Sequence, residues 1–218
     1  DLSKNINLEQ LYIQRTNISS LDISQLKKLQ LLMANGAALT ELTAVDLPAL
    51  EQIQVTKNNI RKMTIRNLPA LQQLHANSNV LKEITLENLP VLQRLNLYDN
   101  ALESLTLDLP KLMFLFVYDN QLSQLDTSHL PMLFQISVSN NPIKKLDLSS
   151  NPIVRNIEAE NMSAMTELNL KNNGDFDEDY EYLIIDGNKS LKTIYVDAGS
   201  EATAVKQLVG SKAINVVE

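Results

Sequence analysis

The chain has 218 residues, and its 19 lysines and arginines against 26 aspartates and glutamates give a net charge of −7 at pH 7. This acidic balance argues against a general nucleic-acid or anionic-membrane binder, because such proteins gather basic residues. The sequence has no cysteine, which excludes disulfides, thiolate metal ligands and thiol nucleophiles. It has no apolar run near 18 residues, so we expect no membrane insertion.

The chain opens on DLSKNIN, which matches the LDLSSNPI of residues 146–153. We therefore expect it to begin inside a repeating unit of a longer protein. Units then recur every 21 residues, with one interval of 20, and begin at Leu8, Leu29, Leu50, Leu71, Leu92, Leu112, Leu133 and Val154. A period in this range, held over most of a chain, predicts a solenoid.

Each unit follows the template LxxLxLxxNxLxxLxLxxLPx, which is clearest over residues 92–133. The first LxL alternates as a short half-buried strand does, and such strands stack in parallel about 4.8 Å apart. The second LxL, as at Leu105 and Leu107, repeats this alternation on the return side, and Leu-Pro then makes a turn. Position 9 predicts a ladder of buried side-chain amides, formed by Asn58, Asn79, Asn100, Asn120 and Asn141. Thr16 and Ala37 occupy this position in the first two units, so we expect the ladder to be weaker there.

The rhythm changes after Val154. The step from Ile157 to Leu168 is half a unit, and residues 174–182, GDFDEDYEY, predict an acidic surface loop. Its alternating Asp175, Asp177 and Asp179 could ligate calcium, but the loop lacks the turn glycine and terminal glutamate of an EF-hand. The following residues recover the phase if Leu183 is aligned with Leu146, and Ile194 with Ile157.

Beyond Gly199 the pattern is helical. Ser200 is the predicted N-cap, and Gly210 ends the helix. An apolar stripe is predicted from Ala204, Val205, Leu208 and Val209, and the strand AINVV follows. We therefore divide the chain into repeats over residues 1–173 and a last irregular repeat with a C-terminal cap over residues 174–218.

These motifs resemble the bacterial leucine-rich repeat family over essentially the whole chain, and the internalin-like cell-surface type most closely. The ending IYVDAGSEATAVKQL is similar to the C-terminal closures of bacterial surface repeats. The resemblance implies an α/β-type leucine-rich repeat solenoid with a parallel β-sheet on the concave face, little helix and a short strand–helix–strand cap. Two features depart from the internalins, namely the period of 21 rather than 22 and the missing N-terminal cap. A weaker resemblance links the chain to the 20-residue repeats of injected bacterial effectors.

Positions 3, 5, 7 and 8 of each unit point outward in columns along the predicted sheet. They bring four aromatic residues onto two neighbouring units, Tyr98, Phe114, Phe116 and Tyr118, flanked by His75, Arg94, Asp99 and Asp119. Exposed rings with a charged rim are typical of a binding hot spot. The alternatives are that the rings stabilise the sheet by cross-strand contact, or that Phe114 tucks under a flank.

The sequence offers no support for catalysis. It contains no GxSxG, HExxH or phosphate-binding glycine loop, so no cofactor is predicted. His75 and His129, the only histidines, fall in different columns and do not predict a metal site. By resemblance, we expect a non-enzymatic module, extracellular or on the bacterial surface, that offers a rigid concave face to a protein or glycan. The alternatives are a passive spacer and an injected effector that binds a host protein.

Overall fold

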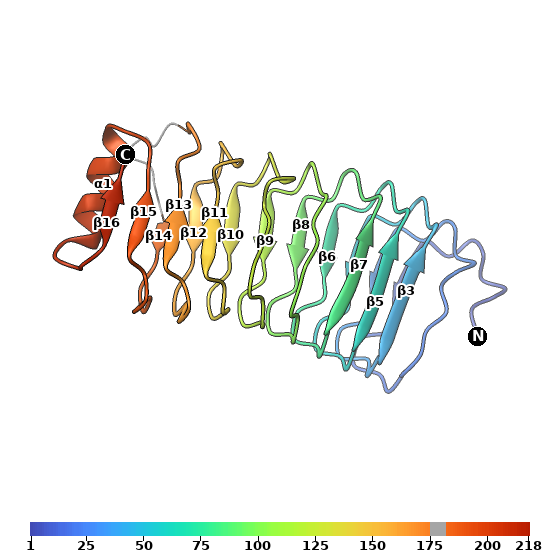
Figure 1. Cartoon of the computed structure of the whole chain (residues 1–218). Coiled ribbons are helices and arrows are strands. Elements are labelled where there is room, and N and C mark those ends of the chain that lie inside the picture. The colour runs from blue at the N-terminus through green and yellow to red at the C-terminus, as the bar shows by residue number, and fades with distance from the viewer. Residues whose placement is uncertain (175–181) are drawn as a thin grey trace.

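The computed structural model describes residues 1–174 and 182–218, with the first and last residues at opposite ends of an elongated coil (Figure 1). One wall of the coil is a nine-stranded parallel sheet with one short strand from each turn. Its strands, in spatial order, are β1 (Gln10–Tyr12), β2 (Leu31–Met33), β4 (Gln52–Gln54), β6 (Gln73–His75), β8 (Arg94–Asn96), β9 (Phe114–Phe116), β10 (Gln135–Ser137), β12 (Asn156–Glu158) and β14 (Tyr182–Ile184).

The sheet forms because the central residue of each strand is aliphatic and points inward. Leu32, Ile53 and Leu95 are fully buried, and the residues on either side of each reach the surface. Pairing joins equivalent positions of successive units, so that Ile53 faces Leu74 across the ladder. The aliphatic positions therefore merge into one continuous core, as the period predicted.

The return side of the coil forms two smaller parallel sheets instead of one. The first contains β3 (Glu41–Val45), β5 (Lys62–Arg66) and β7 (Glu83–Glu87), and the second contains β11 (Lys145–Asp147), β13 (Glu167–Asn169), β15 (Thr193–Tyr195) and β16 (Asn215–Val217). Leu105 and Leu107 are buried as expected, but residues 101–109 form no strand.

The gap spans two units, because residues 121–130 form no strand either, and the first of them lacks a corner residue. Strands β3, β5 and β7 are each followed by a residue with a left-handed backbone, at Asp46, Asn67 and Asn88. The 20-residue unit is one residue shorter at this point, with only Asp108 between its second LxL and Leu-Pro. It therefore has no equivalent of the corner that ends β3, β5 and β7.

The turns after Val154 keep alternating between the two walls. Leu183 pairs with Ile157 in the nine-stranded sheet, whereas Ile194 pairs with Leu168 on the return side. The alignment of Leu183 with Leu146 was therefore wrong by half a turn. Both halves of a unit carry an LxL, so the aliphatic pattern alone does not separate them. The three aspartates weighed as calcium ligands lie outside the described residues.

The chain then forms helix α1 (Ser200–Val209), which leads into β16 beside β15, so the predicted strand–helix–strand arrangement is confirmed. The N-cap position belongs to Gly199, whose φ of 99° favours glycine, and Ser200 is instead the first helical residue. The predicted stripe was also partly wrong, because α1 buries Glu201, Ala202, Val205 and Val209 and leaves Ala204 and Leu208 exposed.

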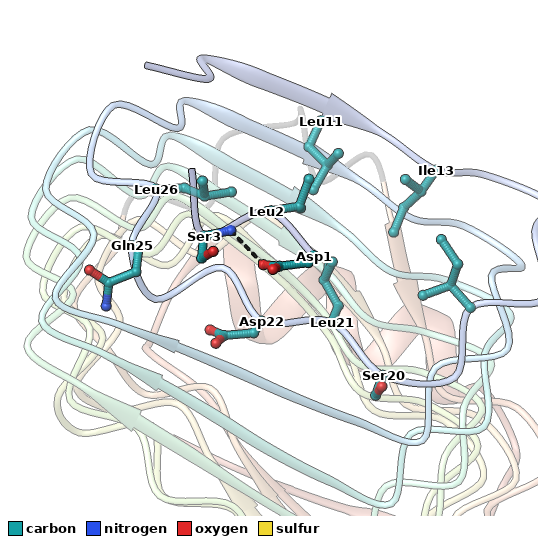
Figure 2. A pocket seen from close by; sticks show the side chains of 11 residues that line it. Asp1, Leu2, Ser3, Leu11, Ile13, Ser20, Leu21, Asp22, Gln25 and Leu26 are labelled. Atoms are coloured by element: carbon teal, nitrogen blue, oxygen red, sulfur yellow. Dashed lines mark hydrogen bonds between the residues drawn. The ribbon is translucent and has the colours of Figure 1, made fainter. Parts of the chain in front are cut away.

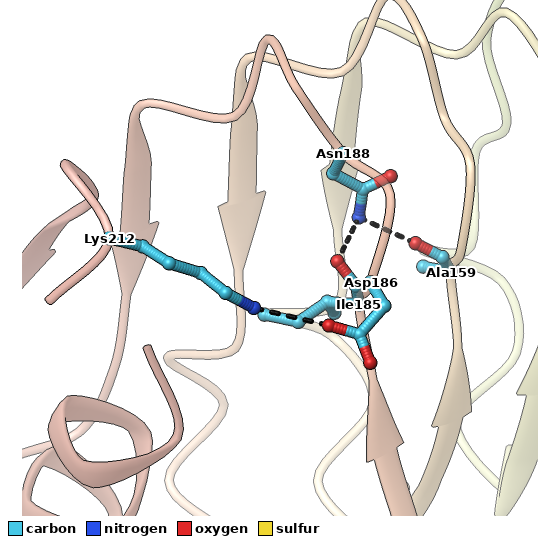
Figure 3. A network of polar contacts seen from close by, with 5 residues as sticks. All are labelled: Ala159, Ile185, Asp186, Asn188 and Lys212. Atoms are coloured by element: carbon cyan, nitrogen blue, oxygen red, sulfur yellow. Dashed lines mark hydrogen bonds and ion pairs between the residues drawn. The ribbon is translucent and has the colours of Figure 1, made fainter. Parts of the chain in front are cut away.

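The amide ladder is present as predicted. Asn120 Oδ1 accepts a hydrogen bond from the Leu102 amide at 3.0 Å, and its Nδ2 donates to the Leu97 and Val117 carbonyls at 3.0 and 3.1 Å. Asn188 extends this ladder (Figure 3), because its Nδ2 donates to the Ala159 carbonyl of the preceding coil at 2.7 Å. The ladder ties each coil to the one before it through groups that are otherwise buried and unpaired.

Candidate functional site

The four predicted aromatic residues gather on the outer face of the nine-stranded sheet. Strands β8 and β9 pair so that Arg94 faces Phe114 and Asn96 faces Phe116. Leu95 and Leu115 lie between them and are fully buried, whereas the outward residues are partly exposed. The alternation predicted from the sequence therefore places all four rings on one surface, which we call the aromatic patch and define as Arg94, Tyr98, Phe114, Phe116 and Tyr118.

Tyr98 and Tyr118 occupy equivalent positions just beyond β8 and β9, and their rings stack. The ring centroids are 4.4 Å apart and the planes differ by 8°. Strands in register about 4.8 Å apart impose this spacing on side chains at equivalent positions. Burial, followed by the neighbouring Tyr98 and the negative charges of Asp119 and Glu158, raises the pKa of the Tyr118 phenol to about 12.

The phenylalanines make contacts on both sides of β9. The Arg94 guanidinium lies 4.2 Å from the ring centre of Phe114 and 5.5 Å from that of Phe116. Phe134 meets the Phe114 ring edge-on, with centroids 6.3 Å apart. Phe134 was missed because it occupies position 2 of its unit, outside the columns considered. Its contact indicates that Phe114 is partly structural, whereas Phe116 and Tyr118 border an open depression.

His75 belongs to the polar rim of the patch. Its Nδ1 lies 2.9 Å from Asn96 Nδ2 and its Nε2 lies 3.3 Å from Gln73 Oε1. Burial, and then the positive charge of Arg94, lower the pKa of the imidazole below its ordinary value of 6.5, so the ring is mainly neutral at pH 7. Asn96 Oδ1 is buried and has no hydrogen-bond partner among the described residues.

The two flanking aspartates lie on turns and not on the sheet face. Asp99 and Asp119 have left-handed backbones, with φ of 56° and 54°. The same conformation recurs at position 8 in Arg15, Gly36, Lys57, Ser78, Asn140 and Asn161. Position 8 is therefore a corner just beyond each strand and not a strand position. The glycine, asparagines and aspartates at position 8 favour a left-handed backbone, and this preference was the sequence signal for the corner.

An open depression of about 480 Å³ begins at the aromatic patch and crosses the sheet toward the C-terminus. We call it the face groove, and its lining includes Phe116, Tyr118, Asp119, Ser137, Ser139, Glu158 and Glu160. Asp119 is held by Asn140 Nδ2 at 2.6 Å, and Asp99 does not line the groove. Sequence reasoning missed both glutamates because the columns were followed only as far as the unit that contains Ser137. One unit further, the same positions are Glu158 and Glu160.

A second hollow, of about 330 Å³, lies at the N-terminal end of the coil (Figure 2). Leu2, Leu11, Leu21 and Leu26 line it, and the Ser3 amide donates to Asp1 Oδ1 at its rim. Asp1, Asp22, Ser3 and Ser20 add polar groups to this aliphatic lining. Within residues 1–174 and 182–218 no three acidic or histidine side chains gather into a metal site. The one described helix is too short to cross a membrane.

No family model matches the sequence, and no curated protein matches it. Solved structures do match. A leucine-rich repeat protein of Leptospira interrogans is 20% identical with a TM-score of 0.63, and the match covers 98% of this chain and 55% of that one. The functional domain of InlJ from Listeria monocytogenes, which includes a cysteine ladder, is 18% identical with a TM-score of 0.46, over 90% of this chain and 51% of that one.

The chain has the leucine-rich repeat fold. This confirms the predicted fold class. The chain spans about half the length of each neighbour. The buried ladder of this chain is built from asparagine side chains, and the sequence contains no cysteine.

Proposed function

We propose that this leucine-rich repeat chain is a non-enzymatic binding module of a bacterial surface or secreted protein. It holds a protein partner on the outer face of its nine-stranded sheet, the face expected to be concave. The observation that carries the proposal is the aromatic patch, where four partly exposed rings gather on neighbouring turns. Leucine-rich repeat folds typically serve as non-enzymatic interaction scaffolds, which agrees with this proposal.

The patch is suited to binding because its rings are already fixed. Tyr98 and Tyr118 hold each other in a stack, and Arg94 holds the two phenylalanines from one side. Buried leucines and the amide ladder fix the strands below. Binding therefore costs this chain little conformational entropy, because the side chains of the patch are already ordered.

A purely structural role for the rings is the main alternative, since Phe114 does contact Phe134. Such a role suits a passive spacer, whose outer face needs no partner. Phe116 and Tyr118 argue against it, because they border the face groove, where a structural ring would be covered. A glycan partner is the other alternative, which the test below separates from a protein.

The test is the triple change Phe114→Ser, Phe116→Ser and Tyr118→Ser. A protein partner is first captured with the unchanged chain from extracts of cells that the source organism contacts. It is then titrated into the unchanged chain and into the variant by calorimetry. We expect the triple change to abolish measurable binding, because hot-spot truncations cost about 2 kcal/mol or more each. The melting temperature should fall only by the loss of the contacts of Phe114 with Phe134 and Arg94, since the inward leucines remain.

The matched control changes Gln52, Gln54 and Thr56 to serine at the equivalent positions of an earlier unit. We expect this variant to bind as the unchanged protein does. If the aromatic variant melts far earlier than the control, the rings are structural and the spacer alternative is supported. If it melts normally and still binds, the partner site lies elsewhere. If glycosidase treatment of the partner removes binding, the ligand is a glycan.

A further inference from the structure

The face groove has one aromatic wall and one acidic wall. Across the paired strands, Phe116 faces Ser137, and Ser137 faces Glu158. The next outward row repeats this order with Tyr118, Ser139 and Glu160, because the backbone ladder continues past the strand ends. The rings and the carboxylates thus stand two strands apart, about 9.6 Å between backbones, with only serines between them.

The floor of this slot is polar and narrow. Ser137 is 1% exposed and Ser139 is 9% exposed, so the two serines lie below the walls. Ser139 Oγ accepts the Glu160 amide at 2.9 Å. The Ser137 hydroxyl lines the groove and forms no hydrogen bond with any residue in the described ranges 1–174 and 182–218. It is therefore a polar group, almost entirely buried, that is available to a ligand.

The acidic wall is not neutralised by the protein. Within the described part of the chain no basic side chain lies within 4.0 Å of Glu158 or Glu160. The next carboxylate along the sheet, Asp186, does have a cation, because Lys212 Nζ lies 3.1 Å from its Oδ1 (Figure 3). Within these residues neither glutamate is thus ion-paired, and the basic residue that lines the groove, Arg94, stands at its aromatic side over the phenylalanine rings.

The aromatic wall already shows the contact that a cation would make. On the far side of Phe116, the Arg94 guanidinium lies over the two phenylalanine rings. The stack with Tyr98 covers one face of Tyr118, and its other face borders the groove. A cation is attracted to a ring face at distances up to about 6 Å. A gap of about 9.6 Å therefore leaves room for a cation between the ring and a carboxylate.

We propose that the slot formed by Tyr118, Ser137, Ser139, Glu158 and Glu160 receives an arginine or lysine side chain from a basic segment of the protein partner. The cation lies on the open face of Tyr118, donates to the serine hydroxyl and pairs with the two carboxylates. This inference rests on the proposed function and adds the chemistry of the partner. A neutral glycan can donate hydroxyl hydrogen bonds to the two carboxylates but brings no charge to balance theirs, and an anionic glycan is repelled by them.

The test is a titration of the isotope-labelled chain by nuclear magnetic resonance with short blocked Gly-Ser peptides. One peptide carries arginine and a second carries citrulline, its uncharged isostere, at the same place. We expect the arginine peptide to shift the amide signals of Ser137, Ser139 and Glu160, and the citrulline peptide to shift them far less. Equal shifts with both peptides overturn the inference, as do shifts spread over all acidic surfaces.

The variants separate a slot from general attraction to an acidic protein. The double change Glu158→Gln and Glu160→Gln should weaken binding of the arginine peptide by about tenfold or more, as expected for a desolvated charge pair. The control, Glu41→Gln with Glu103→Gln, removes the same charge from exposed positions away from the groove and should change binding less than about twofold. Equal losses in the two variants overturn the slot.

The inference and the proposed function can fail separately. If the arginine peptide does not bind but the triple aromatic change still abolishes partner binding, the cation is wrong and the patch stands. If the peptide binds in the slot but the triple aromatic change does not weaken partner binding, the proposed function is wrong. The assignment of the slot to that partner is then wrong as well. A neutral oligosaccharide that shifts the slot amides when the peptide does not would replace the cation with a glycan.

Discussion

Single residues hold neighbouring coils together in this chain, and Asn120 shows how. It is 2% exposed and satisfies one amide and three carbonyls of two successive coils. Its spacing in the template was enough to predict this role, because one amide side chain donates several hydrogen bonds and accepts another at one buried point. The exposed Asn59 has the same side chain and forms no such bonds.

We expect Asn120→Ala to lower the free energy of unfolding by about 1–3 kcal/mol, because it leaves buried backbone groups without partners. Asn59→Ala, at an exposed position, should change it by less than about 0.5 kcal/mol. Urea denaturation of both variants checks this. Equal midpoints would show that the hydrogen bonds of the Asn120 side chain contribute nothing measurable to stability.

A buried carboxylate in α1 was not predictable, since no sequence pattern marks it. Glu201 is 2% exposed, and its Oε2 accepts the Asp197 amide. Its Oε1 has no hydrogen-bond partner among the described residues. Burial, together with the nearby charge of Asp197, raises the pKa of the Glu201 carboxyl from 4.5 to about 7.

This pKa makes stability depend on pH. Between pH 4.5 and 7 the folded chain binds a proton at Glu201 that the unfolded chain has released, so this contribution to stability is lost as the pH rises through that window. We expect Glu201→Gln to remove this loss. From pH 5 to pH 8 the free energy of unfolding of the variant should therefore rise by about 2–3 kcal/mol relative to that of the unchanged chain. Urea midpoints at both values measure this. The control Glu103→Gln keeps Glu201, so its midpoints should fall with pH as those of the unchanged chain do. A Glu201→Gln variant that shows the same fall would contradict the assignment.

At the scale of elements, the strands were predictable and the corners were not. A buried aliphatic at the centre of each strand follows directly from LxL, as at Leu95 and Leu115. The left-handed corners at Asp99 and Asp119 were read as sheet positions because a corner depends on backbone conformation, which the aliphatic pattern does not report. The same limit explains the half-turn error at Leu183.

We propose that residues 174–218 close the core that residues 1–173 build, with α1 as the covering element. Val205→Asp puts a charge into the buried face of α1 and should release it. Because each coil contacts only its neighbours, we expect hydrogen exchange to accelerate in β15 and β16 while β2 to β8 keep their protection. Leu208→Asp, at a position 45% exposed, is the control. A uniform loss of protection would show that the coil unfolds as one unit.

At the scale of the whole molecule, the period alone predicted the solenoid, because stacking repeats is the only way to bury their shared faces. The aromatic patch also followed from the period, since Tyr98 and Tyr118 occupy one position in successive units. The face groove did not. It needs a large residue, a small one and a charged one at equivalent positions of three units, and the depth of Ser137 between its neighbours depends on side-chain packing.

The tyrosine stack gives the molecule a built-in optical signal. The chain contains no tryptophan, so its near-ultraviolet absorption and emission come from only 6 tyrosines and 4 phenylalanines. Two chromophores 4.4 Å apart with nearly parallel planes couple to each other, which sets Tyr98 and Tyr118 apart from the rest in near-ultraviolet circular dichroism. The Tyr118 phenol, with a pKa of about 12, also ionises late in an alkaline titration at 295 nm. Whatever settles against that ring will disturb the coupled signal, so occupancy of this surface can be followed without attaching a dye.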